Sequence, residues 1–174
     1  ANGISTDKRM SVATSAVDVI AWSEDTDGDS STVADQEIQV MVKQNTAWST
    51  PITLTSNLYS DASPLLTQTS TGQPMLVWVR EHVTRTVSLT ETESFDQLYF
   101  SIYENGWLTP TIGFEASGIN ELALANTPTG EIVLVWQEVS DNGLDLYYAV
   151  YDEDLQVFGR GQTLTESTSA KWAY

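Results

Sequence analysis

The sequence contains no cysteine and few basic side chains. Its 174 residues include 24 Asp and Glu but only 7 Lys and Arg, so the formal net charge is −17. Without cysteine the chain has no disulfide bond, thiolate metal ligand or thiol nucleophile. A strongly negative surface repels nucleic-acid phosphates and anionic lipid head groups, so we expect no nucleic-acid partner. The acidity suits a cation or a basic partner, or it serves solubility alone.

Long apolar runs are also missing. The longest runs, such as IVLVW at 132–136, fall far short of the roughly 20 residues that cross a bilayer, so we expect no membrane insertion. Nothing at the N-terminus has the charged and then apolar pattern of a signal peptide. We place the protein outside the cell or at the cell surface, with its signal removed or carried by a longer precursor.

No segment carries a sustained apolar stripe at helical spacing, so we expect little or no helix. Apolar residues instead alternate with polar ones in the segments 37–45, 96–106 and 144–153, which is typical of β-strands. Turn-forming residues separate such segments, as in TSTG at 69–72 and TPTG at 127–130. These patterns predict antiparallel strands joined by short turns.

One strand pattern is written three times. It ends in a tryptophan followed closely by an acidic residue, as VDVIAWSE at 17–24, PMLVWVRE at 74–81 and EIVLVWQE at 131–138. The tryptophans, Trp22, Trp78 and Trp136, are 56 and 58 residues apart. A second aromatic series follows them, at Trp48, Trp107 and Phe158. The chain therefore holds three units of about 58 residues.

The repeats predict an all-β fold of three β-propeller blades, each a four-stranded antiparallel unit, at about 1–56, 57–115 and 116–168 with a C-terminal tail. Consecutive apolar residues, as in MLVWV at 75–79, indicate strands covered on both faces, which radial stacking provides. A β-sandwich is the alternative, since regular short strands fit it too. The predicted strands lie near 10–14, 17–23, 36–43, 47–54, 64–68, 74–80, 97–103, 107–112, 121–125, 131–137, 144–151 and 156–164.

The units resemble the sialidase-like propellers of the BNR type, whose blades carry a short acidic turn ending in Trp, the Asp box. The matching segments are KQNTAWSTP at 43–51, YENGWLTP at 103–110 and YDEDLQVFG at 151–159, and none shows the full Ser-x-Asp-x-Gly-x-x-Trp form. The resemblance implies a ligand face formed by the loops between second and third strands and by the connections between blades. Sialidases of this kind bind a carboxylate with three arginines, whereas this chain has four arginines in all, at 9, 80, 85 and 160.

Three blades leave two open flanks, because propellers usually have about four to eight blades. The chain is therefore expected to be part of a longer propeller, or to associate with a second copy that completes a ring.

The residues expected near the ligand face come from those loops and strand ends. Two of the loops, at 24–36 and 81–96, are long and polar, and long loops commonly carry function. Glu24, Glu81 and Glu138 follow the repeated strand in all three units, which indicates a repeated structural position more than one active site. The candidates are Glu24, Tyr59, Asp61, Arg80, Glu81, Asn120 and Glu138.

One loop predicts a metal site. Asp25, Asp27 and Asp29 alternate in EDTDGDSS at 24–31, and Ca²⁺ prefers such oxygen ligands. The segment resembles the start of an EF-hand loop but departs from it in the place of glycine and of the closing acid. A solvated acidic loop is the alternative.

These observations favour a non-catalytic binding or structural interaction module of an extracellular or cell-surface protein, with a protein or glycan as its partner. The alternative is part of a sialidase-like glycoside hydrolase acting on glycans, which would use two of the many carboxylates.

Overall fold

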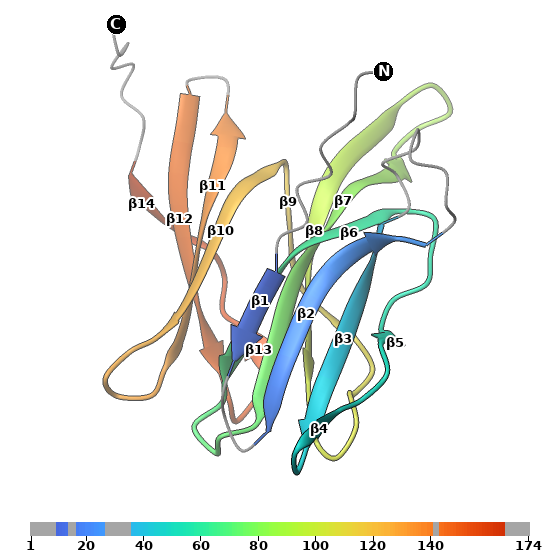
Figure 1. The fold of residues 1–174 in the computed structure, drawn as a ribbon. Helices are drawn as coiled ribbons and strands as arrows, with labels where there is room; N and C mark the ends of the chain where they lie inside the picture. The colour runs from blue at the N-terminus through green and yellow to red at the C-terminus, as the bar shows by residue number, and fades with distance from the viewer. Residues whose placement is uncertain (1–9, 14–16, 27–35, 141–142, 166–174) are drawn as a thin grey trace, which may run out of the picture.

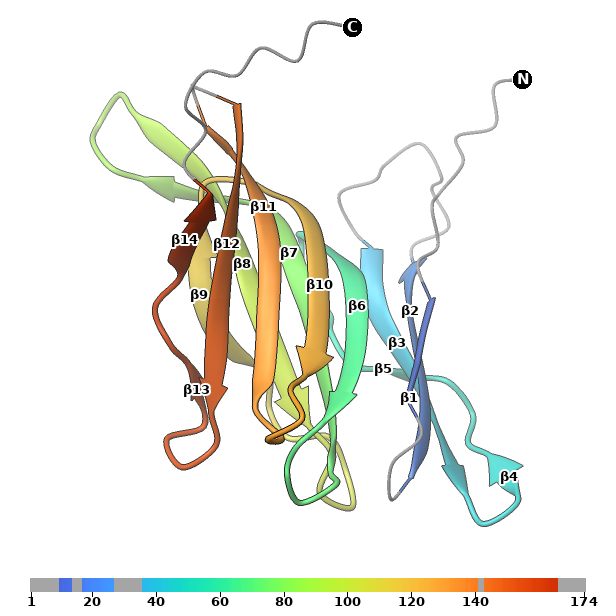
Figure 2. The same cartoon turned by 90° about the vertical axis from the view of Figure 1, so that its left-hand side faces the viewer.

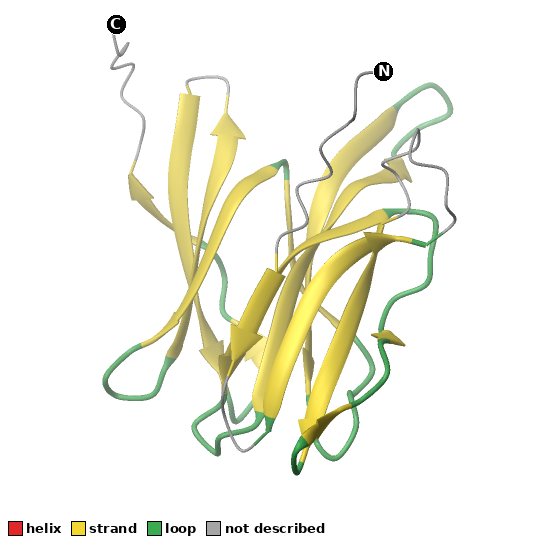
Figure 3. Cartoon of the chain, viewed as in Figure 1, coloured by secondary structure: helices red, strands yellow, loops and turns green. Residues whose placement is uncertain are grey.

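Every element that the structure describes is a β-strand. The computed structural model describes residues 10–13, 17–26, 36–140 and 143–165, and no helix occurs among them (Figures 1 and 3). This described part accordingly holds no helix with the length and apolarity of a membrane span. The strands form three separate antiparallel sheets whose strand order follows the chain. The predicted all-β fold of three propeller-type blades is confirmed, and the alternative of a two-sheet sandwich is wrong.

Each blade is built from strands that pair with their neighbours in sequence. The first blade contains β1 (Met10–Ala13), β2 (Asp18–Asp25), β3 (Gln36–Gln44), β4 (Ala47–Trp48) and β5 (Ile52–Thr53). The second contains β6 (Ser60–Gln68), β7 (Pro74–Thr86), β8 (Thr92–Ile102) and β9 (Thr111–Ala116). The third contains β10 (Ile119–Asn126), β11 (Ile132–Ser140), β12 (Gly143–Asp152), β13 (Val157–Phe158) and β14 (Gln162–Thr165).

The turns between the first two strands of the second and third blades are built alike. Gly72 donates its N–H to the carbonyl of Thr69, and Gly130 donates to that of Thr127, both over 2.9 Å. Both glycines have a positive φ, +80° and +90°, which side chains of other residues disfavour. The repeated Thr-x-Thr-Gly is therefore a turn signal, as the sequence predicts.

The first strand of the middle blade lies at the centre of the molecule. β6 contacts β1, β2 and β3 of the first blade and also β10 of the third. Figure 2 shows β6 between β10 and the first blade. The first strands of the blades are thus gathered together, as the inner strands of a propeller are.

Alternate side chains of the middle blade serve two interfaces. On β7, Leu76 and Trp78 belong to the apolar cluster shared with the first blade, whereas Val77 belongs to the cluster shared with the third. Trp136 of the third blade takes the place of Trp78 and packs toward the second blade. Trp78 is fully buried and Trp136 is 3% exposed, so each contributes roughly 3 kcal/mol of hydrophobic stabilisation. These two tryptophans therefore pack blade against blade, as the repeat predicts.

The outer strands depart from the prediction. The expected strand at 47–54 is split into β4 and β5, with Pro51, which has no N–H to donate, between them. The expected strand at 156–164 is likewise split into β13 and β14. In the second blade β9 begins at Thr111, and the expected start survives only as an isolated bridge between Tyr103 and Trp107.

The predicted loop at 81–96 is wrong. β7 and β8 continue their pairing to Thr86 and Thr92, past a bulge between Arg80 and Val83. The hairpin projects well beyond the rest of its sheet (Figure 1). Only residues 87–91 form its tip, so the segment offers a rigid ribbon in place of a long loop.

Both terminal blades present a face that no other blade covers. Because side chains alternate, Ile20 and Trp22 point away from the second blade on the first one, beside Val12, which is 60% exposed. Val135 and Tyr148 of the third blade similarly point away from the second blade. The two expected open flanks are therefore present in the described part of the chain.

Candidate functional site

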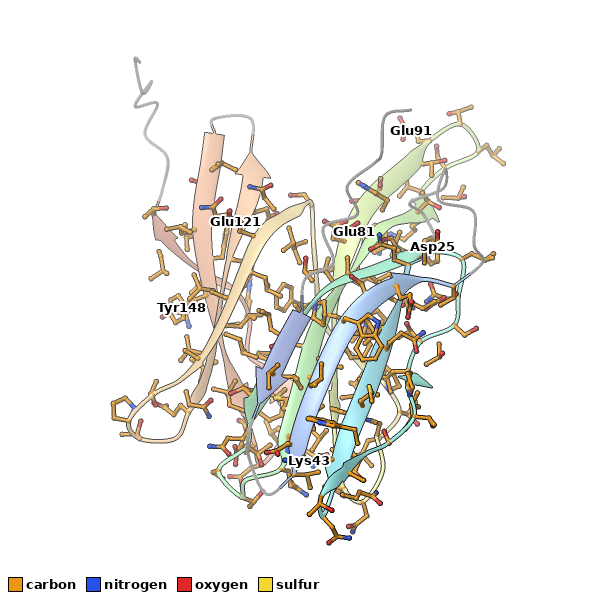
Figure 4. The ribbon with its side chains drawn as sticks, in the orientation of Figure 1. Asp25, Lys43, Glu81, Glu91, Glu121 and Tyr148 are labelled. Atoms are coloured by element: carbon orange, nitrogen blue, oxygen red, sulfur yellow. The ribbon has the colours of Figure 1, made fainter. Side chains whose placement is uncertain are left out.

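The predicted ligand-face residues gather at one end of the blades. β2 and β7 run toward this end, and β6 and β10 begin there; we call it the upper rim. Asp25, Glu81 and Glu91 lie toward it, and Lys43 lies near the opposite end (Figure 4). Asp96 of the second blade accepts from the backbone N–H of Ile119 at this end, whereas Asn126 of β10 bonds to Thr67 and Gln68 of β6 at the opposite end.

A buried ion pair stands at the start of β6. Asp61 has no exposed surface and accepts from Arg80 through both carboxylate oxygens, from Nε to Oδ1 and from the second guanidinium nitrogen to Oδ2, each over 2.9 Å. Trp78 Nε1 donates to Oδ1 over 3.2 Å, and Asn57 Nδ2 donates to Oδ2 over 2.6 Å. Four hydrogen bonds compensate the cost of burying this charge.

Arg80 is held from its other side by an aromatic ring. Its guanidinium lies 4.3 Å from the ring centroid of Tyr99 and donates to the Tyr99 hydroxyl over 3.1 Å. The ring of Tyr99 stacks on Trp78 with 5.7 Å between centroids. Burial by itself lowers the pKa of Arg80, but the hydrogen bond and charge of Asp61 outweigh it and leave that pKa raised. Arg80 therefore stays a cation, anchored between a carboxylate and a ring.

The cluster extends into the first blade through Glu37 on β3. Asn57 donates its backbone N–H to Glu37 Oε1 over 2.6 Å and its side-chain amide to Oε2 over 3.3 Å. The side-chain oxygen of Asn57 accepts from the backbone N–H of Tyr59. Burial raises the pKa of Glu37, against hydrogen bonds to Thr55 and Asn57 that lower it. Asn57 thus ties the two blades together at the rim.

The repeated acid after the strand tryptophan has a structural role in two blades. Trp22 Nε1 donates to Glu24 over 3.1 Å, and Trp136 Nε1 donates to Glu138 over 3.5 Å. In the second blade Arg80 takes this position and Asp61 replaces the acid as acceptor. Glu81 comes one residue later, so its predicted equivalence to the other two glutamates is wrong.

At the third blade the rim residues form hydrogen bonds with the segment that joins β9 to β10 and with the start of β10. Glu138 accepts from the backbone N–H of Ser117 over 3.1 Å and also from its hydroxyl. Asn120 is exposed and donates to Gln137 over 3.4 Å. The buried Asp96 of β8 accepts from the backbone N–H of Ile119 over 2.7 Å, which joins the second blade to the third.

Sequence reasoning missed Glu37, Asn57 and Asp96. Each is a polar residue in or beside a strand with ordinary alternation, and no repeat or motif marks it. Only the packing of two blades shows that Glu37 and Asp96 accept from backbone donors of the next segment of the chain and that Asn57 donates to carboxylates of two blades.

The predicted calcium ligands are only partly described. Asp25 ends β2 and is partly buried, while Asp27 and Asp29 lie outside the described residues. Among the residues that the structure describes, no group of three or more His, Cys, Asp or Glu could hold a metal ion. The calcium site stays a prediction.

How deeply each rim carboxylate is buried decides whether it can contact a ligand. Asp61 and Glu37 are 0% and 4% exposed and fully bonded, so neither can reach a ligand without breaking the cluster. Glu24, Glu81 and Glu138 are only partly buried and are among the accessible carboxylates of the rim. The rim therefore combines a rigid charged base with accessible acids, a polar arrangement suited to hydroxyl-rich ligands.

Comparison with known proteins identifies the fold. No family model and no curated protein sequence matches this chain. The structure is similar to an endo-arabinase from Bacteroides thetaiotaomicron VPI-5482, with a TM-score of 0.57 and 13% identity over 90% of this chain and 61% of that one. It is also similar to a thermostable family-43 glycoside hydrolase, with a TM-score of 0.60 and 12% identity over 90% of this chain and 54% of that one.

A further similar structure is a protein of unknown function from Dyadobacter fermentans DSM 18053, with a TM-score of 0.55 and 11% identity over 90% of this chain and 50% of that one. The chain thus spans between half and about three fifths of these proteins. At this identity the similarity establishes the fold alone, as part of a β-propeller like those of five-bladed glycoside hydrolases.

Proposed function

We propose that the chain is part of a glycoside-hydrolase-type propeller that acts on glycans, and that its upper rim forms one side of the glycan site. The observation that carries this proposal is that hydrogen bonds join all three blades at the rim. Asn57 links Glu37 of the first blade to Asp61 of the second, and Asp96 of the second blade accepts from Ile119 of the third. The similarity to an endo-arabinase and to a family-43 glycoside hydrolase supports it.

The roles follow from exposure. Asp61 and Arg80 keep the rim rigid, and the accessible Glu81, Asn120 and Glu138 contact the sugar. Hydrolysis of a glycosidic bond needs two carboxylates at a set separation, one on each side of the bond. The remaining blades supply the opposite side of the site, since a central propeller site is lined by all inner strands.

A binding and turnover experiment tests the proposal. The chain is titrated with arabinose oligosaccharides and with cellotriose by calorimetry, beside the double variant Glu81→Gln/Asn120→Ala. We expect binding that the double variant weakens about tenfold or more, because two polar contacts are removed at once. Absence of binding by every sugar, together with absence of turnover, would contradict the proposal.

A non-catalytic interaction module is the second candidate. The observation that favours it is that Asp61 and Glu37, the two most deeply buried carboxylates of the rim, are both committed to structural hydrogen bonds. Sugar binding without any turnover, in a ring completed by its remaining blades, would select this candidate over a hydrolase.

The open flanks suggest how the ring closes. Each interface within the chain sets a tryptophan-bearing face, such as that of Trp78, against an aliphatic face of the preceding blade. The uncovered face of the first blade carries Trp22, and that of the third carries Val133 and Val135. A tryptophan-bearing face and an aliphatic face are the two kinds of face that pack together within the chain. The ring is therefore closed by further blades of a longer chain or by a second copy. The solution mass of the 174-residue chain separates the two.

A further inference from the structure

A groove opens between the first and second blades, near the turns at the end opposite the upper rim. It has a volume of about 390 Å³, within the range of about 300–1,000 Å³ common for small-molecule sites. Its walls come from β3 and the split outer strand of the first blade and from the turn at 103–107 of the second. Both walls belong to this chain, so no missing blade is needed to form it.

The aromatic residue that lines the groove, Trp107, has a counterpart at the other blade interface. Tyr103 pairs with Trp107 in the second blade as Tyr151 pairs with Phe158 in the third. At the second interface Phe158 is 6% exposed and packs edge-on against Phe100, with 5.6 Å between centroids.

In the first blade a smaller residue stands where the second blade has Phe100. The residue in register with Phe100 is Val40, because Val40 pairs with Ala21 as Phe100 pairs with Val77. Val40 is fully buried and belongs to the apolar cluster against which Trp107 packs. Trp107, the counterpart of Phe158, is partly exposed and lines the groove.

The lining combines aromatic surface with unused polar groups. The rings of Tyr103 and Trp107 meet edge to face with 5.6 Å between centroids. Within the described part of the chain, the Tyr103 hydroxyl and the side-chain amides of Gln44 and Asn105 make no hydrogen bond, and all three residues line the groove. Amides and a phenol can each donate and accept, which matches a row of sugar hydroxyls.

The lining is also free of charge. None of the ten residues that line the groove is acidic or basic, although the whole chain carries a formal charge of −17. An aromatic wall can pack on the C–H face of a sugar ring while the amides bind its hydroxyls. Without carboxylates at the groove, hydrolysis of a glycosidic bond has no acid or base.

We propose that this groove is a second glycan site, which binds a neutral sugar ring and does not hydrolyse it. It lies at the opposite end of the blades from the rim, so it holds a glycan independently of the rim. The rim and the groove are both proposed to bind glycans, but the proposal for the groove does not depend on the proposed function of the rim.

The test uses the 174-residue chain and three neutral or charged trisaccharides: cellotriose, an arabinose trisaccharide and sialyllactose. Indole N–H signals are followed by NMR, with Trp107→Phe identifying the signal of Trp107. We expect that signal to move with a neutral trisaccharide and to stay in place with sialyllactose, while the signals of Trp22 and Trp136 stay unchanged.

Two sets of variants locate the binding. Gln44→Ala/Tyr103→Phe removes two unbonded polar groups from the groove with little effect on folding, and Glu81→Gln/Asn120→Ala alters the rim. The groove variant should weaken the response of Trp107 about tenfold, since each hydrogen bond contributes about two- to tenfold in affinity. The rim variant should leave it unchanged. The proposal is overturned if no neutral sugar moves the Trp107 signal, or if only the rim variant weakens its response. If the rim binds no sugar but the Trp107 signal still responds, the proposed function fails and the groove proposal stands.

Discussion

Replacing Asp61 by asparagine tests whether the buried ion pair holds the rim together. The substitution keeps the shape of the side chain but removes its charge. Arg80, whose side chain is only 16% exposed, then loses its counter-ion, and an amide N–H₂ faces the donors of Arg80 or Asn57. Removing one partner of a buried pair typically costs about 3–5 kcal/mol, and we expect the lower end, about 3 kcal/mol, because Arg80 keeps some contact with water.

The loss is measured by urea unfolding of the 174-residue chain, and it corresponds to a fall in Tm of about 6–12 °C. Asp18→Asn is the matched control, because Asp18 and Lys43 form a pair at 3.0 Å whose side chains are 32% and 36% exposed. Exposed pairs contribute less than about 1 kcal/mol. The double variant Asp61→Leu/Arg80→Met should recover much of the loss, since no charge then remains buried. Equal destabilisation by Asp61→Asn and Asp18→Asn would refute the reasoning.

Three other results are expected. Burial and the charges of Glu153 and Asp152 raise the pKa of Tyr151 to about 12 in the folded chain, while the unfolded phenol ionises near its ordinary value of 10.0. The contribution of Tyr151 to stability is therefore fully present below pH 10 and is lost as the pH rises toward 12. Tyr151→Phe should lessen this fall, as urea midpoints at pH 8 and pH 11 would show, while Tyr147, whose pKa burial also raises, keeps its own part; equal falls in both proteins would argue against it. Gly161→Ala places a Cβ 2.7 Å from the buried ring of Trp136 and should cost about 1–3 kcal/mol in thermal or urea unfolding, whereas Gly118→Ala, with open space around it, should change little. Ca²⁺ at a hundredfold excess over its Kd should raise Tm by about 5 °C or more if Asp25, Asp27 and Asp29 bind it, and identical melting in Ca²⁺, in EDTA and in Asp25→Asn would dismiss the site.

The wrong assignments share a physical cause. The hairpin at 81–96 was expected to be a loop because its polar residues hide strand alternation. Pairing along its backbone, the two buried side chains Val83 and Phe95, and the ion pairs of Arg85 with Glu93 and Glu115 hold it as a ribbon. Strand pairing needs only backbone groups, so a polar sequence can extend a strand that a neighbour has already ordered.

The site shows the same limit. The sequence marks Asp61 and Arg80 as candidates from their place beside repeated strands, but nothing in it says that Asp61 is completely buried. That follows from Trp78, Arg80 and Asn57, which meet the carboxylate from a second strand and from the connection between blades. A charge is buried only where such donors converge, and their convergence is a property of three dimensions.

The sequence by itself determined the number of blades, the Thr-x-Thr-Gly turns and the strand tryptophans, because each depends on local periodicity and on turn chemistry that repeats along the chain. Only the tertiary structure decided which face of each blade is covered and which acidic side chains are buried and hydrogen-bonded. It also decided where a groove opens beside Trp107, between β3 and the turn at 103–107. These features depend on which side chains from different blades meet, and no pattern within one strand contains that information.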